Sequence, residues 1–391
     1  MKKACVVGGS NGIGLAISLE LINQGYYVFI FDVVEPDKSI LSNESTYEYV
    51  NYNLLDFYVE PFNSLIEDQD LEVLMFTAGI GRCAHFENLC LGEIEKILTV
   101  NSESIIKIVR LFYSRIKNME KFYCGIMGSI AGLINSPLFS VYAASKAAIC
   151  RFIESINIEL EYGKFPNRIL NVSPGSIKGT KFNGSSFNDI DSTIELARNI
   201  LSELFNSSEL YIPEYETIYK KVIERNLSDS HLFGLESYEY KLNSGRRTDE
   251  YKGCIGYLSG TFDLFHVGHL NLLKRAKKNC DYLVVGVHPD ASHKGKKTFI
   301  PFNERKEIVR SVRFVDEVIT SFPEDSDAWD VVHYNKLFVG SDYKNTERFI
   351  KYEKYFEDKN VEIVYFPYTQ GTSSTQIRDV ILTSKCEKNE I

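Results

Sequence analysis

Two histidines three residues apart, His266 and His269, stand where a helix is expected to begin. The apolar run at 254–258 before them indicates a strand, and the apolar spacing of 270–276 after them indicates a helix. Residues three apart share one helix face, so both imidazoles can donate N–H groups to an anion at the helix's free backbone N–H groups. Gly268 leaves room for that anion to approach the backbone. The pattern predicts chemistry on phosphate groups.

A tyrosine and a lysine further upstream are separated by about one helical turn. Tyr142 and Lys146 are four residues apart in an apolar-periodic segment that predicts a helix to about residue 161. A lysine cation on that face lowers the pKa of a phenol, which makes proton transfer near neutral pH feasible. The pair therefore predicts acid–base catalysis. A structural role is the alternative, because this spacing is common on helices.

The start of the chain predicts a dinucleotide site. A strand pattern at 4–7 leads into the glycine turn 8–14, and a helix and a second strand closed by Asp32 follow. The glycines allow a tight turn and bring a pyrophosphate against the helix N-terminus. Asp32 can accept hydrogen bonds from both adenosine ribose hydroxyls, whereas a 2′-phosphate would meet like charge. NAD(H) is therefore favoured over NADP(H). The alternative is a strand-end acid that only faces solvent.

These features together resemble the short-chain dehydrogenase/reductase family over about residues 1–225. The resemblance implies that Tyr142 protonates a substrate carbonyl whose oxygen Ser129 holds, while hydride comes from the cofactor. It also implies that Lys146 binds the nicotinamide ribose and that Asn101 completes the catalytic set. The implied cofactor-binding residues are Gly8, Ser10, Asn11, Gly12, Ile13, Gly14, Asp32, Ala78, Gly79, Pro174 and Gly175.

The chain departs from this family's pattern in three places. Val7 stands where a threonine is usual, and 76–79 reads Phe-Thr-Ala-Gly instead of Asn-Asn-Ala-Gly. Both changes are expected to loosen the hydrogen bonding around the adenosine. The segment that closes over substrate in the family is short and polar here, at 182–186. It favours a small, polar or phosphorylated substrate.

The histidine segment resembles the His-x-Gly-His signature of the cytidylyltransferases, such as the glycerol-3-phosphate cytidylyltransferases. The resemblance implies that His266 and His269 steady a triphosphate while the acceptor's phosphate attacks the α-phosphorus. The run 313–318, Arg-Phe-Val-Asp-Glu-Val, is similar to the Arg-Tyr-Val-Asp-Glu-Val of that family. The run 371–375, Gly-Thr-Ser-Ser-Thr, is similar to its Gly-Ile-Ser-Thr-Thr.

A displacement at phosphorus between a triphosphate and a phosphorylated acceptor needs cations to offset charge repulsion. Lys294 and Arg313 are the candidates for catalysis, and a solvated basic loop is the alternative for either lysine of this loop. The expected nucleotide- or substrate-binding residues are Gly260, Thr261, Phe262, Asp263, Lys296, Arg305, Asp342, Gly371, Ser373, Ser374 and Thr375. No residue is assigned as a metal ligand by spacing; Mg²⁺ is expected to enter with CTP, close to Asp263.

Two departures weaken the identification of glycerol 3-phosphate as the acceptor. Tyr368 stands where the glycerol-3-phosphate enzymes carry an arginine, and Ser341 replaces the first acid of their Gly-Asp-Asp-Trp, leaving Asp342.

Length and composition limit the number of domains and the classes of partner that these interpretations allow. With 391 residues, 44% of them hydrophobic and 25% charged, the chain is expected to be soluble and to form more than one domain. A net charge of −9 argues against a nucleic-acid partner. The eight cysteines lack a CxxC pair, which favours reduced thiols and no structural zinc. Because signal peptide and membrane span are also lacking, a cytoplasmic homo-oligomer with no membrane partner is expected.

Both halves alternate strands with helices, which predicts an α/β chain of two doubly wound parallel-sheet (Rossmann-like) domains in tandem. We expect a dehydrogenase/reductase domain at 1–227, a polar linker at 228–252 and a cytidylyltransferase domain at 253–391. Within the linker, 232–235 is apolar enough to dock on a neighbour.

The sequence thus predicts a bifunctional enzyme. One domain would reduce a small keto- or aldo-sugar, expected to be phosphorylated, to an alditol phosphate with NAD(P)H. The other would couple that phosphate to CTP, giving a CDP-alditol of the glycerol or pentitol type for capsule or teichoic-acid-like polymers. Two alternatives stay open: another nucleotide or acceptor, as in adenylyl transfer to a sugar phosphate, or one inactive domain that senses a ligand. The sequence does not identify the alditol, the order of the reactions, channelling or the number of subunits.

Overall fold

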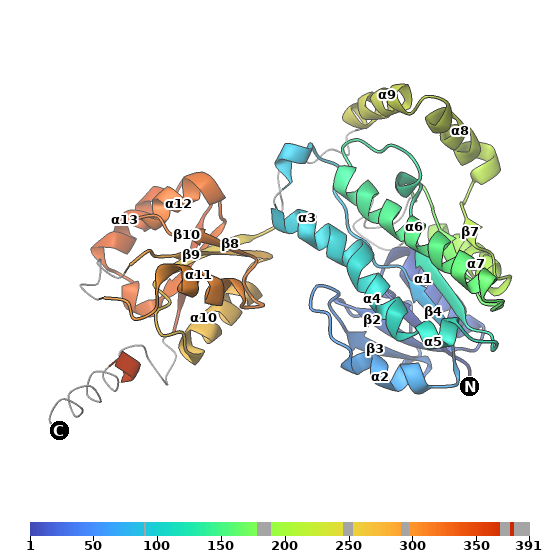
Figure 1. The fold of residues 1–391 in the computed structure, drawn as a ribbon, viewed down its shortest axis with the longest axis horizontal. Helices are drawn as coiled ribbons and strands as arrows, with labels where there is room; N and C mark the ends of the chain where they lie inside the picture. Colours follow the sequence, from blue (N-terminus) through green and yellow to red (C-terminus); the bar gives the residue numbers. More distant parts are fainter. Residues whose placement is uncertain (90, 178–188, 245–252, 291–296, 368–375, 379–391) are drawn as a thin grey trace. The chain divides into compact units, whose positions relative to one another are not determined.

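The computed structural model describes residues 1–89, 91–177, 189–244, 253–290, 297–367 and 376–378. The chain forms two compact units, Met1–Tyr251 and Lys252–Ile391. Each contains one sheet in which every paired strand runs parallel to its neighbours, with helices on both faces (Figure 1). The predicted fold class, two doubly wound α/β domains in tandem, is confirmed.

The sheet of the first unit has seven strands in the order β3-β2-β1-β4-β5-β6-β7. The order reverses between β1 and β4, and such a switch point is where open α/β sheets bind ligands, at the carboxyl ends of the strands. The strands are β1 (Lys3–Val7), β2 (Tyr27–Asp32), β3 (Tyr47–Asn51), β4 (Leu71–Phe76), β5 (Tyr123–Met127), β6 (Ile169–Val172) and β7 (Leu210–Tyr211).

Alternation along β1 builds the core of the first unit on both faces of the sheet. Ala4 and Val6 pack with α1 and α7, whereas Cys5 and Val7 pack with α2, α4 and α6. The helices are α1 (Gly12–Asn23), α2 (Glu60–Glu67), α3 (Leu91–Leu98), α4 (Ser104–Leu111), α5 (Tyr113–Ile116), α6 (Ser140–Tyr162), α7 (Ile190–Phe205), α8 (Lys220–Ser228) and α9 (Ser230–Asn243), with π-helical turns at Thr99–Glu103 and Tyr215–Tyr219.

Helix α9 occupies residues that the sequence analysis assigned to a linker, so that prediction is wrong for 230–243. Asp229 starts the helix by accepting a hydrogen bond from the backbone N–H of Leu232, at 2.9 Å. The polar composition that indicated a linker reflects a helix with no fully buried residue. The hairpin of α8 and α9 belongs to the first unit.

The sheet of the second unit has five strands in the order β10-β9-β8-β11-β12. All six residues of β9 are buried, which is typical of a central parallel strand. The elements are β8 (Ile255–Gly260), α10 (Val267–Lys278), β9 (Tyr282–Val287), α11 (Phe302–Arg310), β10 (Glu317–Thr320), α12 (Asp325–Val332), β11 (Lys336–Gly340), α13 (Glu347–Phe356) and β12 (Glu362–Phe366). Helices α10 and α11 cover one face, and α12 and α13 cover the other.

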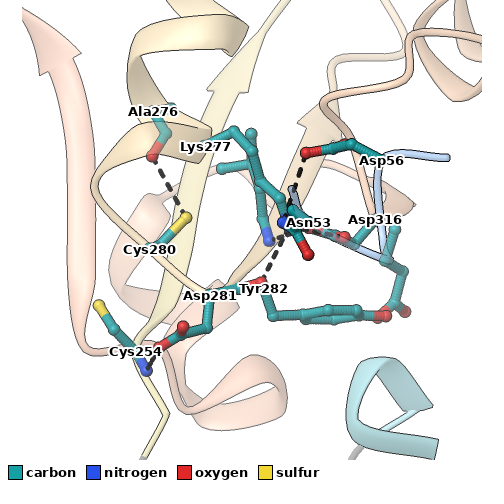
Figure 2. A network of polar contacts seen from close by, with 11 residues as sticks. Asn53, Asp56, Cys254, Ala276, Lys277, Cys280, Asp281, Tyr282 and Asp316 are labelled. Atoms are coloured by element: carbon teal, nitrogen blue, oxygen red, sulfur yellow. Dashed lines mark hydrogen bonds and ion pairs between the residues drawn. The ribbon is translucent and has the colours of Figure 1, made fainter. Parts of the chain in front are cut away.

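Figure 2 shows the polar contacts that join the end of α10 to the neighbouring strands. The ammonium of Lys277 contacts the Asp316 carboxylate at 2.6 Å and the backbone oxygen of Asp281 at 2.8 Å. The Asp281 carboxylate in turn accepts from the backbone N–H of Cys254 at 2.7 Å. Asp316, the acid of the Arg-Phe-Val-Asp-Glu-Val run, therefore anchors a helix to the sheet.

None of the helices in the described part of the chain combines the length and apolarity that crossing a membrane requires.

Candidate active sites

The glycine turn after β1 is packed too closely for side chains at two positions. Gly8 has φ +90°, and a Cβ there would lie 2.3 Å from the backbone nitrogen of Ala78. A Cβ on Gly14 would lie 2.1 Å from the Gly8 oxygen. Thr77, which departs from the family's asparagine, donates to that same oxygen at 2.9 Å. The turn is therefore fastened to the end of β4.

Asp32 lies at the end of β2 and faces the same turn. Its carboxylate accepts from the backbone N–H of Ser10 at 3.0 Å and from that of Val33 at 2.8 Å. The hydroxyl oxygen of Ser10 is buried and has no hydrogen-bond partner among the described residues. The turn therefore offers one unused polar atom beside its backbone N–H groups.

A cavity of about 640 Å³ lies over the carboxyl edge of this sheet. It brings together most of the residues predicted for the reductase site. Those that line it are Gly8, Asn11, Gly12, Ile13, Gly14, Asp32, Ala78, Gly79, Ser129, Tyr142, Lys146, Pro174 and Gly175. Ser10 and Asn101, also predicted, are buried and are not among the lining residues.

Tyr142 and Lys146 lie on the face of α6 that borders the cavity. The Tyr142 hydroxyl is hydrogen-bonded to the side chain of Ser129. The ammonium of Lys146 donates to the backbone oxygen of Met127 at 2.7 Å, and it lies 5.9 Å from the centroid of the Tyr142 ring. The three predicted catalytic side chains therefore border one cavity.

The expected effect of Lys146 on Tyr142 is not found. Burial raises the pKa of Tyr142 above its usual value, and the hydrogen bond from Ser129 offsets this only in part. Burial lowers the pKa of Lys146 to about 8. Desolvation outweighs charge attraction here because the amine bonds to a carbonyl oxygen of β5 rather than to the phenol.

Asn101 lies in the π-helical turn between α3 and α4. Its amide accepts from the backbone N–H of Ile80 at 2.9 Å and donates to the Ile80 oxygen at 2.8 Å. A second N–H donates to the Ser145 hydroxyl at 3.0 Å. Asn101 thus joins the loop after β4 to α6, and π-helical turns are frequent at functional sites.

Two neighbours of the Tyr142 ring were not predicted from the sequence. A Cβ on Gly81 would lie 2.6 Å from Cδ2 of that ring. The ring of Phe139 meets it edge to face, with centroids 5.8 Å apart and an interplanar angle of 62°. Neither contact has a sequence signal, because both depend on how the loops after β4 and β5 fold.

In the second unit, the two histidines close the start of α10. Nδ1 of His266 accepts from the backbone N–H of Gly268 at 3.0 Å, and Nδ1 of His269 accepts from the backbone N–H of His266 at 3.4 Å. The helix therefore begins with a reciprocal capping box in which imidazoles replace the usual side chains.

This capping fixes where each ring carries its proton. A neutral imidazole whose Nδ1 accepts a hydrogen bond is protonated on Nε2. The two ring centroids are 4.1 Å apart, so the rings lie side by side at the start of α10. Burial lowers the pKa of His266 below its usual value, which favours this neutral form.

Aromatic packing holds His269. The rings of Phe262 and Phe265 each lie with their centroid 5.4 Å from that of His269. Phe262 is buried and has φ +51°. A Cβ on Gly260 would lie 2.9 Å from its ring. Gly260 and Phe262, predicted to bind the nucleotide, therefore support His269 from behind.

Arg305, predicted to bind phosphate, is fully buried. Its guanidinium donates to the backbone oxygens of Thr261, His288 (2.8 Å), Pro289 (2.7 Å) and Ile300 (3.0 Å). These carbonyls satisfy the charge without a ligand, so Arg305 braces the loops after β8 and β9. The phosphate contact predicted for Arg305 stays a prediction. Thr261 Oγ1, by contrast, is buried without a hydrogen-bond partner among the described residues.

Asp263 was expected beside the nucleotide's magnesium ion. Its carboxylate instead accepts from the backbone N–H groups of Phe299 and Ile300, each at 3.0 Å, and from Arg378, also at 3.0 Å. These donors occupy the oxygens that a metal would use. Among the described residues no group of three or more His, Cys, Asp or Glu side chains is arranged to hold a metal ion. Arg378 was missed, because nothing in its local sequence marks it.

The remaining predicted residues are placed as follows. Arg313 is exposed, with its guanidinium 4.9 Å from the centroid of the Phe314 ring. Asp342 is exposed in the turn after β11, at the same carboxyl edge as the histidines. The predicted residues outside the described part of the chain are Lys294, Lys296, Gly371, Ser373, Ser374 and Thr375, together with Tyr368 and the 182–186 segment.

Comparisons with known proteins agree with this division. The short chain dehydrogenase family model matches residues 2–191, and the cytidylyltransferase-like model matches residues 257–380. A glycerol-3-phosphate cytidylyltransferase of Bacillus subtilis is 39% identical over 126 residues, which is 31% of this chain and 92% of that protein. The chain therefore belongs to the cytidylyltransferase family through its second unit, and its first unit carries the domain that the short chain dehydrogenase model matches.

The dehydrogenase domain has more distant relatives. A probable short-chain type dehydrogenase/reductase of Helicobacter pylori is 28% identical over 178 residues, covering 45% of this chain and 65% of that protein. A short chain dehydrogenase of Burkholderia cenocepacia, solved in complex with NADP, is 20% identical with a TM-score of 0.49. It aligns with 61% of this chain and 99% of its own.

Proposed function

We propose that this chain makes a CDP-alditol in two reactions. The dehydrogenase domain reduces a small keto- or aldo-sugar phosphate to an alditol phosphate. The cytidylyltransferase domain joins that phosphate to CTP, releasing pyrophosphate, and the product supplies a capsule or teichoic-acid-like polymer. The observation that carries the proposal is the fusion itself, since a dehydrogenase domain shares a chain with nearly the full length of a glycerol-3-phosphate cytidylyltransferase.

A nicotinamide cofactor fits the first cavity. The close-packed glycines, the buried Ser10 hydroxyl and the Asp32 carboxylate suit a pyrophosphate and an adenosine ribose. Asp32 favours NAD(H) over NADP(H), because a 2′-phosphate would face its charge. When bound, the cofactor supplies hydride.

The residues of α6 and β5 supply the proton in this reduction. The Tyr142 hydroxyl, hydrogen-bonded to Ser129, donates its proton to the carbonyl oxygen of the substrate. The raised pKa keeps the phenol protonated at neutral pH. Lys146 holds a positive charge near the Tyr142 ring while the phenol oxygen gains negative charge as its proton leaves.

The two histidines act together in the transfer reaction. His266 and His269 donate from Nε2 to the triphosphate at the start of α10, where the positive end of the helix dipole also favours an anion. A phosphate oxygen of the acceptor attacks the α-phosphorus, and the bond to pyrophosphate breaks. Mg²⁺ enters bound to CTP rather than through Asp263, whose oxygens already have donors.

A pyrophosphate-release assay with CTP and ATP tests the transfer reaction against glycerol, ribitol, arabinitol and erythritol phosphates. We expect one alditol phosphate and CTP to give the highest kcat/KM. NADH oxidation with the matching keto-phosphates tests the coupled reduction. Preference for ATP over CTP supports adenylyl transfer instead, and absence of one of the two activities supports a sensing domain.

Separate substitutions test whether the two sites work independently. We expect Tyr142→Phe to lower reduction by about 10²–10⁴-fold, the usual contribution of a general acid, and to spare transfer. His269→Ala is expected to do the reverse. Equal loss of both activities in either variant contradicts the two-site proposal.

A further inference from the structure

The loop at 133–139, between Ser129 and α6, is held by the hairpin of α8 and α9. The backbone N–H of Asn135 donates to the side-chain oxygen of Asn226, at 3.0 Å. The side-chain amide of Asn135 donates to the backbone oxygen of Ser230, at 2.8 Å. The hairpin therefore fixes the middle of a loop that leads into the catalytic helix.

Lys241, on α9, makes the second attachment. Its ammonium donates to the Ser136 hydroxyl at 2.8 Å and to the backbone oxygen of Pro137 at 3.0 Å. The same ammonium lies 5.6 Å from the centroid of the Phe139 ring. Burial lowers the pKa of Lys241 to about 8, so it still carries its charge at neutral pH.

The attached loop ends against the catalytic tyrosine. Phe139 packs edge to face on the ring of Tyr142. Leu138, between Lys241's acceptors and Phe139, has φ +63°, a conformation that a leucine adopts only when its surroundings hold it. The backbone oxygen of Leu138 accepts from Ala84 N–H at 2.8 Å.

Tight packing does not hold this loop against the hairpin. A cavity of about 670 Å³ separates much of 131–137 from α8 and α9. The polar contacts of Asn135 and Lys241 therefore hold the loop on the side of the hairpin, and the hydrogen bond from Ala84 to Leu138 holds its end.

We propose that Lys241 is a positioning residue for carbonyl reduction. By holding Ser136 and Pro137, it keeps Phe139 against Tyr142 and thereby fixes the angle of the phenol. The inference rests on the proposed role of Tyr142 as proton donor. It gives a catalytic task to the helix that immediately precedes the connection to the cytidylyltransferase domain.

Full-length Lys241→Met tests this, because methionine keeps the length of the side chain but cannot donate. We expect kcat for reduction to fall about tenfold to a hundredfold, since small misplacements of a reacting group have effects of that size. KM for NADH and the rate of cytidylyl transfer should stay unchanged, and Lys241→Arg should restore part of kcat. The matched control is Lys221→Met, which removes an exposed lysine on α8.

Unchanged kcat in Lys241→Met overturns the proposal. If Lys241→Met does not fold, Ser136→Ala takes its place. This substitution removes a single hydroxyl, which is one of the two groups that accept a hydrogen bond from Lys241. A smaller fall in kcat is then expected, and wild-type kcat overturns the proposal.

A second measurement requires no substrate. In protein labelled with ¹³Cζ-tyrosine, the Tyr142 signal is assigned by its loss in Tyr142→Phe, and its pKa is measured by titration. We expect that pKa to lie above the usual value in the wild type and to move toward it in Lys241→Met, because a loosened loop admits water. If the Tyr142 pKa is the same in Lys241→Met as in the wild type, the positioning role of Lys241 is contradicted. A wild type that reduces no carbonyl would refute only the proposed function, because the pKa measurement does not depend on activity.

Discussion

The guanidinium of Arg378 donates to the carboxylate of Asp263 at 3.0 Å, from a position 115 residues further along the chain. Only 5% of the Asp263 side chain and 17% of the Arg378 side chain are exposed. Arg378 also donates to the backbone oxygen of Lys297 at 2.9 Å. One residue therefore joins the histidine loop to the loop that follows β9.

Arg378→Ala should impair cytidylyl transfer and leave reduction unchanged. Removing one partner of a buried ion pair leaves the other charge uncompensated, an effect of about 3–5 kcal/mol in full burial. Because Arg378 is partly exposed and the backbone N–H groups of Phe299 and Ile300 still donate to Asp263, we expect a smaller loss, about 1–3 kcal/mol in unfolding free energy. The histidine loop then shifts, so kcat/KM for transfer falls. Chemical unfolding measures the first effect, and steady-state kinetics of pyrophosphate release measure the second. Arg310→Ala, which removes an exposed arginine of the same unit, is the control and should match the wild type.

His266 should have separable roles in folding and in transfer. Asparagine can still accept the Gly268 N–H as a helix cap but has no Nε2–H, whereas alanine loses both. His266→Asn is therefore expected to abolish most transfer with little loss of stability. His266→Ala should cost a further ~0.5–2 kcal/mol in unfolding free energy, typical of a lost cap. Thermal unfolding of the two variants compares them, and equal stability contradicts a capping role.

The hydrogen bond from the Gly268 N–H to Nδ1 of His266 predicts that stability and transfer both depend on pH. Burial lowers the pKa of His266 in the folded protein below its unfolded value, so the fold favours the neutral ring. The stabilisation is complete above the ordinary pKa of histidine and is lost as pH falls through the lowered value. Transfer should decline over the same acidic range, because a proton on Nδ1 displaces the Gly268 N–H. A transfer rate that shows no acidic decline at any pH where the protein stays folded contradicts this assignment.

Sequence patterns correctly placed the site residues whose positions depend only on neighbouring residues in the chain. The glycine turn and the paired histidines each lie at a strand-to-helix junction, and Tyr142 and Lys146 lie one turn apart within α6, so adjacent sequence is enough to place them. Arg305 shows the limit. Its charge predicted a phosphate ligand, but four carbonyl oxygens from distant loops surround it. Sequence spacing does not contain such long-range contacts, which also explains why Arg378 and the Lys241 attachment were missed.

Reduction should lose activity as pH rises through about 8. Burial lowers the pKa of Lys146 to about 8, so its positive charge is present below that pH and absent above it. Lys146→Arg stays charged and should remove the alkaline decline, although the longer side chain is expected to lower kcat. Lys241 titrates over the same range, so the assignment to Lys146 depends on this variant. An alkaline limb that persists in Lys146→Arg contradicts it.

Gly81 should be intolerant of any side chain because of Tyr142. An added Cβ would lie 2.6 Å from Cδ2 and 3.0 Å from Cγ of the ring, so the phenol must move. The ring cannot tilt freely, because Phe139 packs on it. Gly81→Ala is therefore expected to lower kcat for reduction about tenfold to a hundredfold without changing transfer.

Gly234→Ala provides the matched control for that substitution. A Cβ there would have its nearest neighbour at 3.7 Å, and the residue lies within α9. It should leave reduction unchanged and raise stability by about 0.4–1 kcal/mol, because alanine loses less backbone entropy on folding. Wild-type kcat in Gly81→Ala would mean that the phenol donates its proton equally well from a displaced position. In that case the precise placement of the ring, on which the Lys241 inference also depends, does not limit the reaction.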